Sequence, residues 1–475
     1  MKKRVLAALV ASACVISLAG CSKTTTSSST PASNNDASNT DASTPADNTS
    51  TDTSTPADNT STDEPVAPAE VGDDGDTLTI LTWSGNSDTK TMVEFFLEQK
   101  GYDASKVVYV GVGENGEAAR DGYKNYLMGE EDADLMVFDA DWVQDYVNDD
   151  CTVGYDAIGL SKADFADAFS YTLANGTAAD GTFKATSFQA TPGGFVYRAD
   201  LAEQYLGVTT PEEMQALVSD WDKFQETAAK VYDASGNTCS LQATEGGLWQ
   251  VFQSNRTQPW VVDGKLVMDT AEDFYDLAKT FADNKYMAGV PQWDGAWYAA
   301  VLDGSAMGDF VPTWGLTTNE GSILYNFTNG DTNAKMAICE GPSGWYWGGS
   351  YIGVANKCDN KTLAKEFIEF FCKDAATMKA YAEKTGDFVN NKTVMTDLTA
   401  SNALLQGQNH YEILTKVLDN LDLEGKITKY DSKIKSAFND SVNGYLEGTY
   451  ATKDDAINAF KDKVAEIYGT DIVVE

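Results

Sequence analysis

The sequence predicts an α/β protein in which a mainly parallel sheet is covered by helices. Segments rich in β-forming residues at 78–83, 106–110 and 135–138 alternate with helical patterns at 91–99 and 117–128. Such alternation is typical of parallel sheets with helices on both faces. The chain has 475 residues, of which 42% are hydrophobic and 11% aromatic. This length and composition are sufficient for two lobes with separate cores.

Charge and residue usage argue against several classes of function. The chain carries 72 Asp and Glu residues against 34 Lys and Arg, for a net charge of −38, whereas nucleic-acid binding needs a basic face. Arginine, the usual partner of carboxylate and phosphate groups, is rare, which disfavours a multiply charged anionic ligand. A single histidine, His410, argues against histidine-based metal sites and a Ser-His-Asp triad. We expect no metal, no cofactor and no nucleic acid.

Residues 1–21 have the pattern of a secretory signal peptide. Basic residues at positions 2–4 precede an apolar run over 5–18 that is too short to span a bilayer. The run ends in Leu18-Ala19-Gly20-Cys21, which resembles the lipobox of bacterial lipoproteins, where the cysteine carries a diacylglycerol. We therefore expect lipidation of Cys21, since two acyl chains hold a protein at a membrane durably. The alternative is an ordinary signal peptide whose cysteine is there by chance.

Residues 22–75 have the composition of a disordered linker. They are Ser, Thr, Pro, Ala, Asn and Asp with almost no large apolar side chain, and an eleven-residue segment at 43–53 is nearly repeated at 54–64. Such a chain cannot bury enough apolar surface to fold, and its reach is about 40 Å. The segment is predicted to be a tether, with a glycosylated stalk as the alternative. Five cysteines follow it, an odd number without a CxxC motif, and their pairing is left open.

Two of the predicted strands end in an aromatic residue accompanied by short polar ones. Trp83 begins the first such turn with Asn86, and the second contains Asp139, Asp141 and Trp142. In open α/β sheets, ligands bind beyond the carboxyl ends of the strands. Aromatic faces stack on sugar rings and polar groups bond their hydroxyls, so this composition suits a polyol.

The order and spacing of motifs along 76–475 resemble a known family. The motifs are Trp83-Ser-Gly, Asp134-Leu-Met-Val-Phe-Asp139, Pro192 to Leu201, Asp303 to Met307 with Trp314, Ala337 to Gly344, Gly348 to Val354, and Asn360 to Phe371. Together they resemble the extracellular solute-binding proteins of family 1, the sugar-binding relatives of maltose-binding protein that serve ABC importers. The lipobox agrees with this resemblance, because Gram-positive members of the family are lipoproteins.

The resemblance implies a periplasmic-binding-protein-like fold of type II, with two α/β lobes built from discontinuous segments and joined by a hinge. Lobe 1 is expected at about 76–190 and 337–386, and lobe 2 at about 195–335 and 390–475. The chain would cross between lobes near 190–194, near 335 and near 386–390. Gly193, Gly194 and Gly386 fit such hinges, since glycine tolerates large backbone changes.

Tryptophans and short polar residues are the candidate ligand-binding groups. The resemblance favours Trp83, Trp314, Trp345 and Trp347 as stacking platforms, with Trp314 and Trp347 on opposite lobes. Four further tryptophans suit the cleft and the core equally: Trp142, Trp249, Trp293 and Trp297. Since Trp293 and Trp297 are four residues apart, one helix face can carry both. The polar candidates are Asn86, Asp139, Asp141, Gln189, Glu245 and Asp387.

The resemblance implies a lipid-anchored binding protein that captures a neutral mono- or oligosaccharide between its lobes and delivers it to an ABC permease. We expect a monomer without enzymatic activity on the outer face of the cytoplasmic membrane of a Gram-positive bacterium. The alternative is a cell-surface adhesin or glycan-active enzyme that uses the same aromatic residues. Paired carboxylates are compatible with glycosidase chemistry, but nothing in the sequence singles out a proton donor and a nucleophile.

Overall fold

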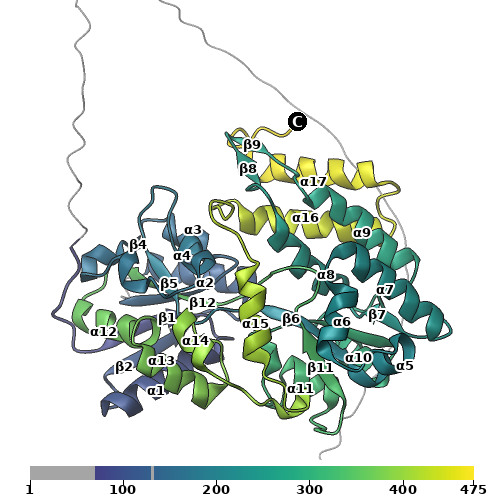
Figure 1. Ribbon diagram of the computed structural model, residues 1–475. Coiled ribbons are helices and arrows are strands. Elements are labelled where there is room, and N and C mark those ends of the chain that lie inside the picture. Colours follow the sequence, from purple (N-terminus) through teal and green to yellow (C-terminus); the bar gives the residue numbers. More distant parts are fainter. Residues whose placement is uncertain (1–69, 130–132) are drawn as a thin grey trace, which may run out of the picture. The chain divides into compact units, whose positions relative to one another are not determined.

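Two large β-sheets organise the part of the chain that the structure describes (Figure 1). The computed structural model describes residues 70–129 and 133–475. The predicted signal peptide with Cys21, and the linker up to residue 69, lie outside the described residues. Each sheet carries its own helices, and the two-lobed α/β fold predicted from the sequence is confirmed.

The six-stranded sheet of lobe 1 begins with the three predicted strands. The first three strands pair in parallel, with the earliest of them in the middle. The next strand in space, β12, comes from far along the chain. It pairs antiparallel with β3, so the sheet is not purely parallel. In spatial order the main path is β2-β1-β3-β12-β4, with β5 also on β12. The strands are β1 (Leu78–Thr82), β2 (Val107–Gly111), β3 (Leu135–Asp139), β4 (Thr152–Val153), β5 (Ala185–Ser187) and β12 (Ser350–Ala355).

Helices cover this sheet and bury a phenylalanine-rich core. The side chain of Asn86 caps the first helix by accepting the N–H groups of Asp88 and Thr89 at 2.9 and 3.2 Å. Phe96 of that helix packs edge to face on Phe370, with ring centroids 5.1 Å apart. The helices of this lobe are α1 (Ser87–Lys100), α2 (Gly116–Met128), α3 (Val143–Val147), α4 (Ser170–Asn175), α12 (Lys361–Cys372) and α13 (Ala375–Thr385), with the short 3-10 turns η1 (Tyr155–Ile158) and η2 (Lys162–Phe165).

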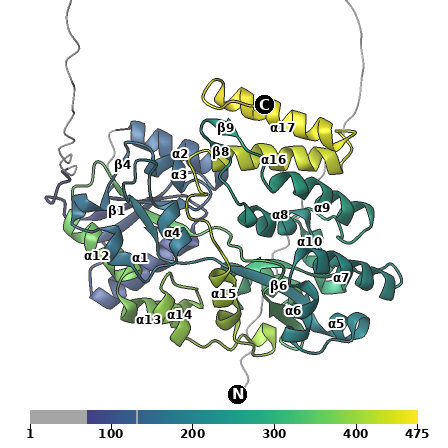
Figure 2. The ribbon, with the colours of Figure 1, turned by 45° about the horizontal axis from the view of Figure 1, so that its top comes forward.

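Lobe 2 is built on a four-stranded sheet of order β11-β6-β10-β7. Its central strand β6 pairs antiparallel with both neighbours, and β7 runs parallel to β10. Helices α16 and α17 pack on each other at the C-terminal end of the chain, as both views show (Figures 1 and 2). The strands are β6 (Gly193–Arg198), β7 (Ser240–Gln242), β10 (Ala306–Pro312) and β11 (Met336–Cys339), with a small hairpin of β8 (Val261–Val262) and β9 (Lys265–Leu266).

The remainder of lobe 2 is mainly helical. Its elements are α5 (Ala199–Leu206), α6 (Pro211–Val218), α7 (Trp221–Ala234), α8 (Glu245–Phe252), η3 (Gln253–Asn255), α9 (Ala271–Asp283), α10 (Gly295–Asp303), η4 (Thr313–Leu316), α11 (Ile323–Thr328), α14 (Lys392–Asp397), η5 (Ala403–Leu405), α15 (His410–Asp419), α16 (Asp431–Leu446) and α17 (Lys453–Tyr468).

A buried carboxyl group, that of Asp309 in β10, connects four elements of lobe 2. Its side chain is fully buried and accepts hydrogen bonds from Trp297 Nε1 at 2.6 Å, Thr244 Oγ1 at 2.9 Å and the Gln242 side chain. Burial raises the pKa of Asp309 to about 7, although these donors act in the opposite direction. Trp297 is therefore a structural residue: its indole N–H is satisfied inside the lobe.

Three segments connect the two sheets and lie side by side. The N–H of Ala190 donates to the Phe388 carbonyl at 2.9 Å, and the N–H of Trp347 donates to the Thr191 carbonyl at 3.0 Å. The second connection between the lobes lies later in the sequence than predicted. Cys339 of β11 pairs with Phe195 of β6, so residues 336–339 belong to the lobe 2 sheet and not to lobe 1. The connecting segments are 188–192, 340–349 and 386–391.

The glycines predicted to act as hinges have other structural roles. Gly193 and Gly194 are buried residues of β6, and a Cβ atom at Gly193 would lie 2.3 Å from the ring of Trp345. Close packing, rather than backbone freedom, therefore requires glycine at 193. Gly386 has a φ of 80° and ends α13 in the left-handed conformation typical of helix C-termini.

The described residues contain neither a membrane-spanning helix nor a disulfide. Within residues 70–129 and 133–475, no helix combines the length and the apolar character needed to cross a bilayer. The five cysteines of this part are unpaired, and four of them are buried. They are Cys151, Cys239, Cys339, Cys358 and Cys372.

Candidate functional site

A cleft of about 830 Å³ opens between the lobes. One wall is formed by residues that follow β1 and β3 and by the end of α13, and the opposite wall by residues that flank α10 and β10 of lobe 2. The connecting segment 347–349 lies between them. Nine of the fourteen candidate ligand-binding residues line this cleft: Trp83, Asn86, Asp139, Asp141, Gln189, Trp293, Trp314, Trp347 and Asp387.

The lobe 1 wall is built on the N-terminus of α1. The N–H of Asn86 donates to the Trp83 carbonyl at 3.0 Å, which folds the turn after β1 back on itself. Trp83 is half-buried, and the edge of its ring packs on Trp142 with centroids 5.7 Å apart. The capping oxygen of Asn86 is occupied, but its Nδ2 has no hydrogen-bond partner among the described residues. This wall therefore offers an indole and an unused amide donor.

Three tryptophans form a cluster on the other side of the cleft. Trp293 and Trp314 are stacked with their rings 12° apart in orientation and 5.9 Å between centroids. Trp347 contacts both, and its carbonyl accepts the indole N–H of Trp314 at 2.9 Å. Trp314 and Trp347 are thus in contact with each other and not on opposite lobes as predicted, because Trp347 belongs to a connecting segment.

Trp293 is the exposed member of this tryptophan cluster. Its side chain is 53% exposed, unusual for so large an apolar group, and its φ of 70° lies in the left-handed region. Such backbone strain in a non-glycine residue is a marker of functional sites. Trp293 precedes α10 while Trp297 lies inside it, so the two do not share one exposed helix face as the sequence suggested.

Carboxyl groups dominate the charge of the cleft. Asp88, Asp139, Asp141 and Asp387 all line it. Burial raises the pKa of Asp139, and the charge of Asp141 adds to this effect. Burial and the charge of Asp88 likewise raise the pKa of Asp387. The cleft therefore repels anions and offers acceptors to hydroxyl or amine donors.

Five candidate residues, four tryptophans and Glu245, do not line the cleft, so the prediction was wrong for them. Trp142, Trp249, Trp297 and Trp345 have 3% or less of their surface exposed, so no ring face is free to stack on a ligand. Trp249 instead stacks on Phe438, with centroids 4.7 Å apart. Trp345 is fully buried and packs edge to face on Phe310. Glu245, half-buried at the start of α8, is also absent from the cleft lining; burial raises its pKa to about 7.

Several cleft residues were missed by the sequence analysis. Asp88 follows the predicted turn that begins at Trp83, and an acidic residue in a first helical turn was the available signal. The others are ordinary polar residues of loops and helix ends whose sequence carries no such signal. They include Ser87, Asn115, Thr313, Asn319, Ser350, Lys384 and Thr385.

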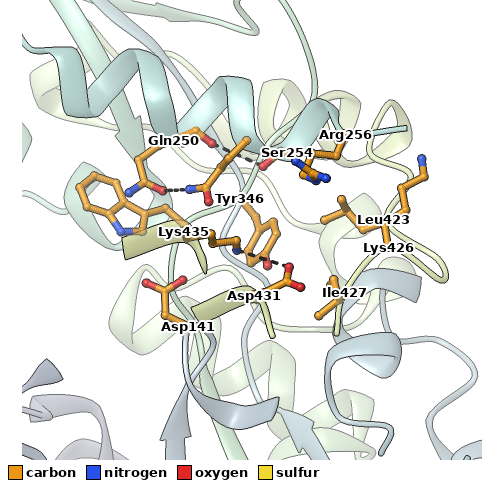
Figure 3. Close-up of a pocket in the computed structure, with 13 residues that line it drawn as sticks. Asp141, Gln250, Ser254, Arg256, Tyr346, Leu423, Lys426, Ile427, Asp431 and Lys435 are labelled. Carbon is orange, nitrogen blue, oxygen red and sulfur yellow. Dashed lines mark hydrogen bonds and ion pairs between the residues drawn. The ribbon is translucent and has the colours of Figure 1, made fainter. Parts of the chain in front are cut away.

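Two further cavities share Asp141 with the cleft. The smaller, of about 20 Å³, has room for roughly one water molecule (Figure 3). In it Lys435 lies 4.0 Å from Asp431, and Tyr346 and Arg256 also line the space (Figure 3). The larger cavity measures about 450 Å³ and is lined by Arg120 and three lysines. Neither contains an exposed tryptophan cluster, so the aromatic cleft is the candidate site.

No protein-family model and no curated protein sequence matches this chain. Solved structures do resemble it. A structure described as an extracellular solute-binding protein of family 1 superposes with a TM-score of 0.70 at 17% identity, over 82% of this chain and 99% of that chain. The galacto-N-biose/lacto-N-biose I-binding protein of the ABC transporter from Bifidobacterium longum, in complex with lacto-N-biose, gives 0.64 at 16% identity, over 85% and 100%.

A third similar structure is the ABC-transporter-associated binding protein from B. animalis subsp. lactis Bl-04 in complex with beta-1,6-galactobiose. Its TM-score is 0.62 at 17% identity, over 82% of this chain and 98% of that chain. At such identities the likeness establishes the fold. The chain therefore has the two-lobed fold of extracellular solute-binding proteins, and these structural neighbours are binding proteins rather than enzymes.

Proposed function

We propose that the protein is a solute-binding protein of family 1 and the lipid-anchored binding subunit of a bacterial ABC importer. It captures a sugar or oligosaccharide in the interlobe cleft and delivers it to permease subunits in the membrane, without chemical change to the ligand. Its place is the outer face of the cytoplasmic membrane. Binding of sugars by structural neighbours from bifidobacteria supports this proposal.

The observation that carries the proposal is the combination of tryptophan faces and polar groups in one cleft. Trp83 lies on the lobe 1 wall, whereas Trp293, Trp314 and Trp347 form the cluster opposite. A stacked sugar ring that buries about 50 Å² of apolar surface gains about 1 kcal/mol from each indole. Several such contacts with hydrogen bonds to hydroxyls are sufficient for micromolar binding.

Closure of the two lobes on the ligand is the step that we propose for its delivery. A sugar between them contacts both lobes fully only when the lobes close, so binding shifts the population towards the closed form. The permease then recognises the surface of the closed form. The three connecting segments are where we expect this motion to occur.

The sugar-binding proposal is tested with a panel of mono- and oligosaccharides. A sugar that binds the folded protein raises its melting temperature. With such a sugar, Trp314→Ala is expected to weaken binding by about 1–3 kcal/mol in calorimetric titration, because a stacking face is lost. Trp221→Ala is the matched control: Trp221 is also half-buried, but it packs on Phe224 outside the cleft. Equal affinities of Trp314→Ala and the unmodified protein would contradict the site.

The anchor is tested separately at Cys21. Expressed with its own signal peptide in a Gram-positive host, the protein is expected in the membrane fraction, and Cys21→Ala is expected to move it to the medium, because the acylated thiol is absent. Cys151→Ala is the control, since Cys151 lies in the folded part of the chain. Membrane association of the Cys21→Ala variant would contradict lipidation at this residue.

A further inference from the structure

One corner of the cleft brings together two carboxyl groups and one amide. Gln189 Nε2 donates to the Asp387 carboxylate at 3.2 Å. Asp88 lies close enough for its charge to act on Asp387, although Asp88 belongs to α1 and Asp387 follows α13, far along the chain. All three side chains line the cleft. The corner therefore presents two neighbouring carboxyl groups to a ligand.

No basic side chain of the described residues neutralises this pair. The basic residue that lines the cleft is Lys384, and its Nζ is paired with Glu98 at 2.8 Å on the exposed side of α13. The pKa of Asp387 is set by burial, by the charge of Asp88 and by hydrogen bonds from the Phe388 backbone and the Gln189 side chain. No lysine or arginine contributes to it. The N-terminus of α1 supplies Asp88 with a partial positive charge only.

The amide of Gln189 provides a second, independent indication of a ligand. The residue is only 2% exposed, and while its Nε2 is bonded to Asp387, its Oε1 has no partner among the described residues. A buried acceptor without a hydrogen bond destabilises the folded protein unless a ligand or a water molecule donates to it. Burial raises the pKa of both Asp88 and Asp387, and no lysine or arginine of the described residues acts against this effect.

We propose that the ligand is a sugar that carries a protonated amine, with its ammonium group held by Asp88, Asp387 and Gln189. An ammonium group has three N–H donors and no acceptor, and this corner offers three acceptors: two carboxylates and the free Oε1. Hydrogen bonds between ionised partners are roughly twice as strong as neutral ones. A neutral sugar supplies no positive charge to the two carboxyl groups, whereas a protonated amine does, so the expectation of a neutral ligand is revised.

The tryptophans explain why the cation is part of a sugar. Trp83 shares the wall with Asp88, through the turn that Asn86 caps, so a ring can stack on the indole while its amine reaches the carboxylates. An indole face also attracts a nearby cation. This inference rests on the proposed function, because it assigns a chemical class to the ligand of the same cleft.

The test compares three forms of each sugar by calorimetric titration of the purified protein at pH 7. The probes are glucosamine, galactosamine and fully deacetylated chitin oligosaccharides, their N-acetylated forms, and the hydroxyl parents glucose, galactose and cello-oligosaccharides. At least one amine form is expected to bind tenfold or more tightly than both of its matched forms. Choline and spermidine, which are cations without a sugar ring, are expected to bind more weakly than that amine sugar.

Variants then assign the preference to the proposed corner. Asp387→Asn and Asp88→Asn are each expected to reduce the preference for the amine at least tenfold, because one carboxylate is lost. Glu383→Gln is the matched control: it removes one negative charge from the same helix, but Glu383 is exposed, pairs with Lys379 and does not line the cleft. The control is expected to keep the full preference.

The outcomes separate this inference from the proposed function. Neutral or acetylated sugars that bind as tightly as the amine forms would overturn the inference and leave the sugar-binding proposal standing. An amine preference that survives both aspartate variants would overturn the assignment to this corner. Binding of no sugar of any form, or equal binding of choline or spermidine, would overturn both proposals.

Discussion

Trp345→Ala is expected to lower the free energy of unfolding by about 3–5 kcal/mol, whereas Trp347→Ala is expected to leave most of it intact. Trp345 is fully buried: its ring packs on Phe310 and fits against Gly193, where even a Cβ atom has no space. Truncation leaves a cavity that the strands around it cannot fill. Trp347, two residues later, is half-buried and faces the cleft.

Chemical denaturation and calorimetric titration of the two variants distinguish these roles. Trp347→Ala is expected to lose sugar affinity by about 1–3 kcal/mol because a stacking face is removed. Trp345→Phe, which keeps an aromatic ring in the same space, is expected to recover part of the stability lost in Trp345→Ala. Equal stability losses in the two alanine variants would contradict the assignment of one tryptophan to the core and the other to the cleft.

The second large effect is a pH-dependent contribution of Asp309 to stability. The pKa of this group is about 7 in the folded protein, against an ordinary value of 3.8. Because the folded state holds the proton more tightly, the contribution is greatest at low pH and is lost as the pH rises through 7. For a single group this loss between pH 5 and pH 7 is about 2 kcal/mol.

The measurement compares the unmodified protein with Asp309→Asn at both pH values. The stability difference in favour of the unmodified protein is expected to be about 2 kcal/mol larger at pH 5 than at pH 7. His410 titrates in the opposite sense, since burial lowers its pKa to about 4, but it is present in both proteins and cancels from the difference. A stability difference that does not change with pH would show that Asp309 is ionised in the folded state.

The predicted strands and helices of lobe 1 were confirmed because their signals are local. Alternation of β-rich runs with amphipathic segments predicted β1, α1, β2, α2 and β3. Since parallel strands end at one edge of a sheet, the residues after β1 and β3 could also be expected to share a site. Trp83, Asn86, Asp139 and Asp141 do line one cleft.

The boundaries between lobes were harder to predict because they depend on strand pairing. The segment 336–339 is equally hydrophobic whichever sheet it joins, and only its register with β6 assigns it to lobe 2. The later position of this connection explains the contact between Trp314 and Trp347. Both residues adjoin the lobe 2 sheet, on segments that converge at the cleft.

The fold class, the acidic character that disfavours anionic ligands, and nine of the residues that line the cleft could be predicted from the sequence alone. Which tryptophans line the cleft and which are buried depends on the tertiary structure. Trp345 and Trp347 are alike in composition and neighbourhood, yet one is fully buried and the other lines the cleft. The tertiary structure also brings together Asp88 and Asp387, which are far apart in the chain, in one corner of the cleft. Burial and proximity arise from packing between distant segments, and no local pattern encodes them.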